Sequence, residues 1–442
     1  MNAHPRTIVV IGAGYVGLVT AAGLAAAGHR IRLVERAPGR LATLRAGRIP
    51  LHEDGLQAVF DAAVVEGRLE ILDTPPTEAP DLVLICVGTP IDNDGVSDLN
   101  QLRSALVDVG PLVADGTTLV IRSTLPVGMT RMIATEARVP TARTFTNPEF
   151  LRQGTALDDF RTPSRAVVGR FADADPDALA VVVDTLVPAS VPTLVVDVAE
   201  AEIIKNGANA FLALKLSFTN ELAGLCERYG ADADIVLDGI GRDPRIGSTY
   251  LRPSFGFGGS CLPKELRTVA AAGEQVGLPM HVTQAVSEAN ASHQRRFVER
   301  IAGAAGGLQG RRVAVLGLAF KAGTDDIRSS PAMNVVRLLS EAGAAVVAHD
   351  PEASANAARE LPGLSIAATP LEAMRGADVA VIATEWPVYR DLDWAAAMEA
   401  MAHAVVVDGR RLLDPVLMTA LGFDHRALGS PDPRPVVSER AG

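Results

Sequence analysis

Short runs of apolar residues alternate with longer stretches of helical periodicity over the first half of the chain. This alternation is typical of βαβ units, whose strands lie side by side in a parallel sheet. The runs that predict strands are Ile8–Ile11, Ile31–Val34, Leu82–Val87, Leu119–Ile121 and Ala166–Val168.

The middle of the chain has a different pattern. Residues from about 198 to 230 are rich in Ala and Leu and contain no Pro, so they predict one long helix. A second helical block is predicted from about 268 to 304.

Beyond Arg311 the alternation restarts and repeats the landmarks of the first half. We therefore predict an α/β fold in which two Rossmann-like parallel-sheet domains are joined by a central helical domain with a long connecting helix. The predicted limits are 1–197, 198–305 and 306–430, with a flexible tail at 431–442. The corresponding segments are Val313–Gly317 with Ile8–Gly12, Val346–Asp350 with Ile31–Glu35, Val379–Thr384 with Leu82–Thr89, and Val405–Gly409 with Leu119–Arg122.

A glycine fingerprint follows the first predicted strand. Gly12 suits a tight turn, Gly14 lets backbone amides approach a pyrophosphate, and Gly17 permits close packing of helix on strand. Glu35 ends the next predicted strand, where a carboxylate accepts hydrogen bonds from a ribose diol; the alternative is an exposed strand-end charge. The carboxylate favours NAD over NADP, although Arg40 lies nearby.

The corresponding turn of the second domain reads Gly317-Leu-Ala-Phe-Lys321 and lacks the fingerprint, so we expect no second NAD there. Lys321, Arg328 and Arg410 instead predict a site for the diphosphate of a nucleotide-bearing substrate. The alternative is a set of scattered surface cations.

Lys205 and Asn209 are one turn apart on the long predicted helix. Together they form a clamp for an oxygen that becomes negative, unless they belong to a solvated face. The small or apolar residues around them, including Ile203 and Phe211, indicate a packed segment.

Two strand-end turns carry further polar groups. Glu149 follows Pro148 and is suited either to activating a water or to a helix N-terminus. Ser123 and Thr124 supply hydroxyls, which commonly cap a following helix.

Cys261 lies on a turn with Gly256, Gly258 and Gly259, and Lys264 follows it. A thiol in such surroundings is either a small buried hydrophobe or a covalent catalyst whose thiolate the lysine stabilises.

Composition limits the remaining possibilities. The 442 residues are 48% hydrophobic, which suffices for two or three cores, and the net charge of −11 argues against a nucleic-acid partner. No apolar stretch approaches the ~18 residues that span a bilayer, and residues 1–6 leave no room for a signal peptide. Three widely spaced cysteines fit the reducing cytoplasm. We expect a cytoplasmic protein with no membrane partner and no metal.

Taken together, these motifs resemble the nucleotide-sugar 6-dehydrogenases of the UDP-glucose/GDP-mannose dehydrogenase family, and the resemblance extends nearly from end to end. They are Gly12-Ala-Gly-Tyr-Val-Gly17, Cys86-Val-Gly-Thr-Pro90, Ser123-Thr-Leu-Pro-Val-Gly128, Asn147-Pro-Glu-Phe-Leu-Arg152, Lys205-x-x-x-Asn209, Phe257-Gly-Gly-Ser-Cys-Leu-Pro-Lys264, Gly317-Leu-Ala-Phe-Lys-Ala-Gly-Thr-Asp-Asp-Ile-Arg328 and Asp408-Gly-Arg410.

The resemblance implies a four-electron oxidation that consumes two NAD. The C6 alcohol of a nucleotide sugar, here UDP-glucose giving UDP-glucuronate, becomes an aldehyde, then a thiohemiacetal and a thioester on Cys261, and finally a uronic acid. Lys205 and Asn209 would stabilise the oxyanions, while Glu149 and Thr124 would handle water and protons.

The resemblance also implies binding residues, and a homodimer or higher oligomer in which Arg245 reaches the diphosphate of a neighbouring subunit. The NAD contacts would be Gly12, Gly14, Tyr15, Val16, Gly17, Glu35, Arg40, Thr89, Pro90, Thr124, Gln153 and Arg328. The substrate contacts would be Glu149, Phe150, Leu151, Arg152, Lys205, Asn209, Arg245, Tyr250, Phe255, Gly256, Phe257, Gly258, Gly259, Lys321 and Arg410.

The chain departs from the family pattern at two positions, with Gln153 in place of Glu and Glu265 in place of Asp. Gln153 cannot act as a base, so a proton role falls to Glu149 or Glu265. GDP-mannose and dTDP-glucose are alternative substrates, although Arg245-Ile-Gly247 favours the UDP-glucose branch. A two-electron hydroxyacid dehydrogenase and a non-catalytic nucleotide-sugar-binding protein are further alternatives; Cys261 argues against the first, and its retention with Lys205 and Asn209 against the second.

Overall fold

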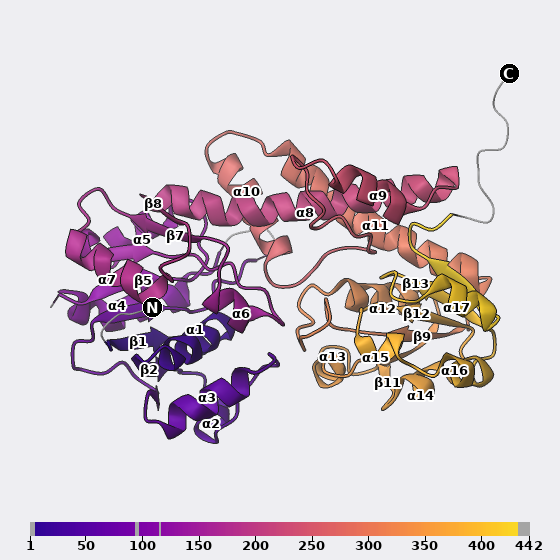
Figure 1. The fold of residues 1–442 in the computed structure, drawn as a ribbon, viewed down its shortest axis with the longest axis horizontal. Helices are drawn as coiled ribbons and strands as arrows, with labels where there is room; N and C mark the ends of the chain where they lie inside the picture. Colours follow the sequence, from indigo (N-terminus) through magenta and orange to yellow (C-terminus); the bar gives the residue numbers. More distant parts are fainter. Residues whose placement is uncertain (1–4, 93–96, 115, 432–442) are drawn as a thin grey trace. The chain divides into compact units, whose positions relative to one another are not determined.

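The computed structural model describes residues 5–92, 97–114 and 116–431 and divides the chain into two compact units (Figure 1). Unit 1 comprises Met1–Ala208 and Arg267–Pro279, and unit 2 comprises Asn209–Leu266 and Met280–Gly442. The limits of the three predicted domains stay a prediction, and the predicted tail lies almost wholly outside the described residues.

The described part of unit 1 contains an eight-stranded sheet of order β3-β2-β1-β4-β5-β6-β7-β8. Its strands pair in parallel except for β6 with β7, which are antiparallel. The strands are β1 Thr7–Ile11, β2 Arg30–Val34, β3 Leu69–Leu72, β4 Leu82–Ile85, β5 Thr118–Ile121, β6 Thr144–Thr146, β7 Ala166–Arg170 and β8 Thr193–Asp197. The helices are α1 Tyr15–Ala26, α2 Pro38–Arg45, α3 Leu56–Val65, α4 Asn100–Ala114, α5 Met129–Glu136, η1 Thr141–Arg143, α6 Ala156–Arg161 and α7 Pro176–Leu186.

Both faces of this sheet are buried, which explains why its central strands read as continuous apolar runs. Along β1, Ile8 and Val10 join a core that includes residues of α1, α3, α6 and α7. Val9 and Ile11 join a second core with residues of α4 and α5. Helices therefore cover the two faces, as the α/β pattern predicts.

Unit 2 contains, within the described residues, a six-stranded parallel sheet of order β11-β10-β9-β12-β13-β14. Its strands are β9 Arg312–Leu316, β10 Ala345–His349, β11 Ser365–Ile366, β12 Val379–Ile382, β13 Val405–Asp408 and β14 Asp424–Ala427. Its helices are α9 Ala233–Gly241, α11 His281–Ala305, α12 Pro331–Glu341, α13 Ser354–Glu360, α14 Pro370–Met374, α15 Pro387–Arg390, α16 Trp394–Ala400 and α17 Pro415–Ala420.

The predicted fold class is confirmed, including the repeat, because β9, β10, β12 and β13 hold the same sheet positions as β1, β2, β4 and β5. The long helix is α8, Val198–Tyr229. The predicted second helical block is two helices, α10 Leu262–Gln275 and α11, separated where Gly277 adopts a positive φ of 72° and Pro279 follows.

No helix among residues 5–92, 97–114 and 116–431 combines the length and apolar character needed to cross a membrane.

Candidate active site

The turn between β1 and α1 has the geometry that its glycines predict. Gly12 has a φ of 97°, and a Cβ there would lie 2.9 Å from the carbonyl oxygen of Cys86. A Cβ at Gly17 would overlap the carbonyl oxygen of Gly12, whereas at Gly14 no heavy atom of the described chain lies within 4 Å. Gly14 also precedes the first residue of α1, so an open backbone at a helix N-terminus is available to a pyrophosphate, and the turn fits NAD.

Glu35 lies at the carboxyl end of β2, beside this turn. Its Oε2 accepts hydrogen bonds from the N–H of Ala13 at 3.1 Å and from Nη1 of Arg40 at 2.9 Å. Burial alone would raise the pKa of Glu35, but the N–H of Ala37 and the guanidinium of Arg40 hold the pKa below its ordinary value. The ionised carboxylate suits a ribose diol and repels a 2′-phosphate.

The loops after β4 and β5 meet through a hydrogen bond. The hydroxyl of Thr89 donates to the carbonyl oxygen of Thr124 at 2.7 Å. Pro90, which follows Thr89, is exposed. Two predicted cofactor residues are thus joined at the carboxyl ends of β4 and β5.

Glu149 and Lys205 form a buried pair in unit 1. Nζ of Lys205 lies 3.4 Å from Oε1 of Glu149, and the two side chains are 5% and 8% exposed. The N–H of Leu151 donates to the other carboxylate oxygen at 2.6 Å, and Nζ lies 5.2 Å from the ring centroid of Phe150. Because α6 begins only at Ala156, Glu149 is not a helix N-terminal carboxylate.

The packed face predicted from Ile203 and Phe211 is wrong for the described chain. These side chains are 55% and 60% exposed, whereas Lys205 is 4% exposed. Apolar residues on a helix do not show which face is buried when several faces carry them.

Glu53, which was not predicted from the sequence, joins the fingerprint to the loop after Glu149. Its carboxylate accepts the Tyr15 hydroxyl, the N–H of Gly154 at 2.6 Å and the N–H of Ala156 at 2.7 Å. Burial and the Glu53 carboxylate raise the pKa of Tyr15. Gln153 directly precedes this anchored segment, and Arg152 pairs with Asp159 at 2.6 Å. A lone Glu in a loop gives no sequence signal of this role.

Two further residues of α8 hold the loop that carries Thr124. Glu202 accepts the N–H groups of Gly128 at 2.6 Å and Thr130 at 2.8 Å, and burial raises its pKa. Nδ2 of Asn206 donates to the carbonyl oxygen of Leu125 at 2.8 Å. Glu202 lies three residues before Lys205 and so shares its face of the helix, which was the available sequence signal; Asn206 gave none.

In unit 2, Cys261 is exposed and directly precedes α10. Its carbonyl oxygen accepts the N–H of Glu265 at 2.8 Å, and Sγ lies 3.7 Å from Oγ of Ser260. The Glu265 side chain is 1% exposed and accepts a hydrogen bond from Nδ2 of Asn209. The exposed thiol is not a core residue, and the N-terminus of α10 favours negative charge.

The glycine loop before Cys261 is held by side chains of α8 and α11. Ser254 N–H donates to Asn220 at 2.8 Å, and Asn290 bonds both the N–H and the carbonyl of Phe257, at 2.9 and 3.1 Å. Burial lowers the pKa of His293 to about 4, so its neutral ring contacts the carbonyl oxygen of Ser254 at 2.8 Å. The roles of Asn220, Asn290 and His293 were not predicted, because polar residues on helices rarely indicate a loop partner.

The glycines of this loop allow close approaches. Gly256 has a φ of 145°, a Cβ at Gly258 would overlap the carbonyl oxygen of Ser329, and one at Gly259 would lie 3.0 Å from the Phe320 ring. Tyr250, before the loop, has an unusual φ of 64° and its carbonyl accepts the Thr219 hydroxyl at 3.4 Å.

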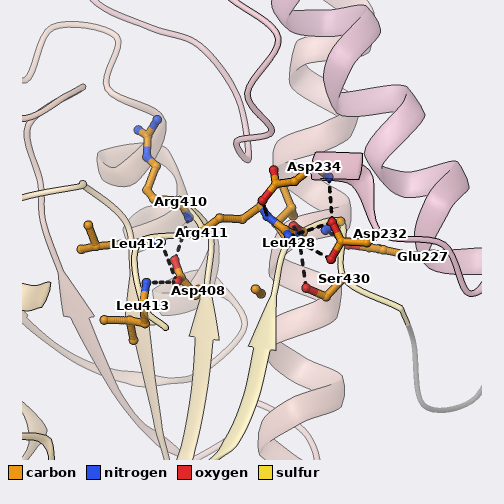
Figure 2. Close-up of polar contacts among 12 residues, drawn as sticks. Glu227, Asp232, Asp234, Asp408, Arg410, Arg411, Leu412, Leu413, Leu428 and Ser430 are labelled. Carbon is orange, nitrogen blue, oxygen red and sulfur yellow. Dashed lines mark hydrogen bonds and ion pairs between the residues drawn. The ribbon is translucent and has the colours of Figure 1, made fainter. Parts of the chain in front are cut away.

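The cationic side chains of unit 2 that were predicted to bind the substrate differ in their contacts. Arg410 lies 4.9 Å from the ring centroid of fully buried Phe255 and donates to the carbonyl oxygens of Ala383 at 2.9 Å and Phe320 at 3.1 Å (Figure 2 shows its direction). Nζ of Lys321 lies 5.8 Å from the Phe320 ring centroid. Phe255 therefore supports Arg410 by packing.

Arg328 and Arg245 are more exposed. Arg328 pairs with Asp326 at 2.6 Å, and this pairing raises the pKa of Arg328. The Arg245 side chain is 87% exposed and pairs with Asp243 at 2.6 Å.

Three family models match successive parts of the chain. Residues 6–186 match the NAD binding domain of the UDP-glucose/GDP-mannose dehydrogenase family, residues 199–292 its central domain, and residues 314–415 its UDP binding domain.

Individual relatives match over almost their whole length. The chain is 37% identical to a UDP-glucose 6-dehydrogenase of Pseudomonas aeruginosa over 441 residues, covering 96% of this chain and 97% of that protein. It is also 37% identical to one of Rhizobium meliloti, covering 96% and 100%. The solved structure of a UDP-glucose dehydrogenase from Pyrobaculum islandicum is 36% identical with a TM-score of 0.86, covering 97% of this chain and 99% of that one.

Proposed function

Because the chain belongs to the UDP-glucose/GDP-mannose dehydrogenase family, we propose that it oxidises UDP-glucose at C6 to UDP-glucuronate through a thioester on Cys261. The chain is an NAD-dependent nucleotide-sugar dehydrogenase of the UDP-glucose 6-dehydrogenase type. The observation that carries the proposed substrate is the 37% identity to proteins named UDP-glucose 6-dehydrogenase over 96% of the chain.

The proposed reaction joins two oxidations by one covalent intermediate. Loss of a hydride and a proton converts the C6 alcohol to an aldehyde, and the Cys261 thiolate attacks that carbon to form a C–S bond and an alkoxide. Loss of a second hydride gives the thioester, and water then breaks the C–S bond to release the carboxylate, the thiol and a proton. Bound NAD supplies the hydride acceptor in each oxidation.

The polar residues that we assign to these steps have the charge or hydrogen-bonding capacity that each step requires. We assign oxyanion stabilisation to the Lys205 ammonium and the Asn209 amide, and proton handling to Glu149 with Thr124. Buried Lys205 is paired with Glu149. When the carboxylate accepts a proton it becomes neutral, so the positive charge of the ammonium is no longer compensated and attracts an oxyanion more strongly.

The two departures from the family pattern bear on thioester hydrolysis. Glu265 keeps a carboxylate in the first turn of α10 and accepts the Asn209 amide, which supports a role in ordering that amide or a water. Gln153 has no basic group, so we assign the base role to Glu149. The expected consequence is retained activity with slower hydrolysis.

The stoichiometry of NADH formation tests the proposal. Purified protein is given UDP-glucose, GDP-mannose and dTDP-glucose in turn, and NADH is counted per sugar consumed. We expect about two NADH per UDP-glucose. One NADH per sugar would refute the thioester, a preference for another sugar would refute the substrate, and UDP binding without any NADH would identify a binding protein.

The Cys261→Ser variant, which retains a smaller, less acidic nucleophile, isolates the covalent step. It is expected to stall after aldehyde or ester formation. Full turnover by this variant would remove Cys261 from the chemistry.

We further propose a homodimer or higher homo-oligomer in the cytoplasm. Within unit 2, one side of α8 exposes Phe211, Phe218, Leu225 and Tyr229, which are 50% to 68% exposed, a pattern that favours burial against another chain. Arg245 is exposed enough to reach a neighbouring subunit's diphosphate.

Mixed oligomers test the role of Arg245. Arg245→Ala and Cys261→Ser chains are unfolded together and refolded at equal amounts. If Arg245 acts across the interface, dimers with one chain of each kind contain one intact site, and the mixture recovers about one quarter of the wild-type activity. A mixture no more active than its components would show that Arg245 acts within its own chain or not at all.

A further inference from the structure

The turn after β13 is built around one buried carboxylate. Asp408 is 0% exposed and accepts the N–H groups of Arg410 at 3.0 Å, Leu412 at 2.8 Å and Leu413 at 2.9 Å. Figure 2 shows these bonds converging on Asp408. Asp408 thereby holds the backbone of the turn on both sides of residue 411.

Arg410 and Arg411 leave the turn in different directions (Figure 2). Arg410 is directed to Phe255 and the Phe320 carbonyl, and Phe320 and Arg410 lie within residues 314–415, which match the UDP binding domain of the family. Arg411 is directed to α9 and to the segment after β14. Arg411 has a left-handed backbone with a φ of 50°.

Arg411 is anchored at every guanidinium nitrogen. Nε donates to Asp234 at 2.8 Å, Nη2 lies 3.0 and 3.1 Å from the two carboxylate oxygens of Asp232, and Nη1 donates to the carbonyl oxygen of Leu428 at 2.9 Å and the hydroxyl of Ser430 at 3.1 Å. The side chain is only 12% exposed. All three guanidinium nitrogens of Arg411 donate hydrogen bonds within this chain, so we do not assign Arg411 a direct contact with a ligand.

A left-handed backbone is unfavourable for a residue with a Cβ, and it persists where surrounding contacts impose it. Here two sets of contacts act on residue 411: the hydrogen bonds from the flanking N–H groups to Asp408, and the contacts of the Arg411 side chain with Asp232 and Asp234. We propose that Arg411 is a positioning residue: its ion pairs with Asp232 and Asp234 hold residue 411 in the left-handed conformation and so direct Arg410 to the nucleotide diphosphate. This inference rests on the proposed function, in which Arg410 binds the substrate.

The variants distinguish the loss of the Arg411 side-chain contacts from a change in the backbone conformation of residue 411. Arg411→Asn removes both ion pairs with a residue that tolerates a positive φ, Arg411→Lys keeps a charge able to reach one aspartate, and Arg410→Ala defines the full loss of the proposed ligand contact. Arg390→Ala, which removes an exposed ion pair with Asp391 in the same unit, is the matched control.

Binding of UDP is measured by calorimetry on the full-length protein, together with the KM values for UDP-glucose and NAD and the thermal midpoint. For Arg411→Asn we expect UDP affinity and the UDP-glucose KM to worsen at least ~10-fold, with the NAD KM unchanged. Arg411→Lys should recover part of the affinity, and Arg390→Ala should match the wild type.

A double variant decides whether Arg411 acts through Arg410. If it does, Arg410→Ala with Arg411→Asn binds UDP no more weakly than Arg410→Ala alone. A lowered thermal midpoint with wild-type UDP affinity in Arg411→Asn would overturn the inference and leave the proposed function standing. Additive losses in the double variant would likewise overturn it. A wild-type protein that neither binds UDP nor oxidises a nucleotide sugar would overturn the proposed function as well.

Discussion

The turns after β1 and β9 occupy the same position in two sheets of the same strand order, yet they present different surfaces to a ligand. Both begin with a glycine of positive φ, Gly12 at 97° and Gly317 at 105°. After Gly12, α1 begins at Tyr15; after Gly317, the next helix in the described chain is α12, which begins at Pro331. A pyrophosphate therefore finds a helix N-terminus at the first turn only, within the part of the chain that the structure describes.

The acidic residues beside the two turns differ as well. Glu35 is bonded in part by Arg40, a side chain that is 44% exposed and able to move away from a ribose. Asp350 is 2% exposed and accepts the N–H groups of Leu318 at 2.7 Å and Ala319 at 3.0 Å and the indole N–H of Trp386 at 3.1 Å. At the same place, therefore, Glu35 suits the proposed ribose contact, whereas the carboxylate of Asp350 is used by the fold.

The largest expected effect is that of Gly17→Ala. The added Cβ would overlap the carbonyl oxygen of Gly12, so we expect a loss of ~3 kcal/mol in the free energy of unfolding and a rise of at least ~100-fold in the NAD KM. Chemical denaturation and initial rates measure these. Gly14→Ala is the control, because its Cβ has room in the described chain: stability should be kept and NAD binding weakened. Equal loss of stability in both variants would contradict this division of roles.

Asp350→Asn should act on stability rather than on cofactor binding. The amide would direct N–H groups at the N–H donors that the carboxylate accepts, so we expect a loss of about 2–4 kcal/mol in the free energy of unfolding. The NAD KM should equal that of the wild type at temperatures where the variant is folded. A raised NAD KM without loss of stability would remove the contrast with Glu35.

Glu35→Gln should give the opposite result with a smaller effect. A neutral amide accepts weaker hydrogen bonds from a ribose and no longer repels a 2′-phosphate. We expect about a tenfold rise in the NAD KM and a smaller preference for NAD over NADP. The thermal midpoint should fall less than in Asp350→Asn, although Glu35 also accepts the N–H groups of Ala13 and Ala37. Steady-state kinetics with both cofactors would show it, and an unchanged cofactor preference would exclude the ribose role.

The smallest effect is expected for Arg40→Ala. The Arg40 guanidinium is substantially exposed, so solvent weakens its ion pair with Glu35, and we expect less than about a threefold change in the NAD KM. An effect as large as that of Glu35→Gln would show that Arg40 itself is a principal cofactor contact.

Much of the fold could be predicted because its strands are buried on both faces. Leu82–Ile85 and Val379–Ile382 read as apolar runs in the sequence and are strands in the structure. Strands β3, β8 and β14 were not predicted: Glu70 within β3 is exposed, as are most residues of β8, and β14 reads Asp-His-Arg-Ala. Short or half-exposed edge strands carry too little hydrophobic pattern to stand out.

The candidate site divides in the same way. The predicted roles of glycines and strand-end acids such as Gly12 and Glu35 depend on the local strand–turn–helix geometry. Their spacing in the sequence therefore indicates these roles. The residues that hold the site, including Glu53 and Asn290, are far from their partners in sequence, and a single sequence contains no record of such pairs. Burial of Lys205 was predicted on the wrong evidence, since its actual contacts are Glu149 and Phe150.

The saturated carboxylate of Asp350 sets a limit on redesign. Two substitutions, Ala319→Gly and Ala322→Gly, would write a complete dinucleotide fingerprint into the second turn. A motif search would then report a second coenzyme site in a loop whose neighbouring acid already has its donors and whose backbone continues to Pro331 before a helix begins. In this chain a fingerprint sequence can therefore occur without a coenzyme site. The acid that would bind the ribose, Asp350, is already used to hold the fold.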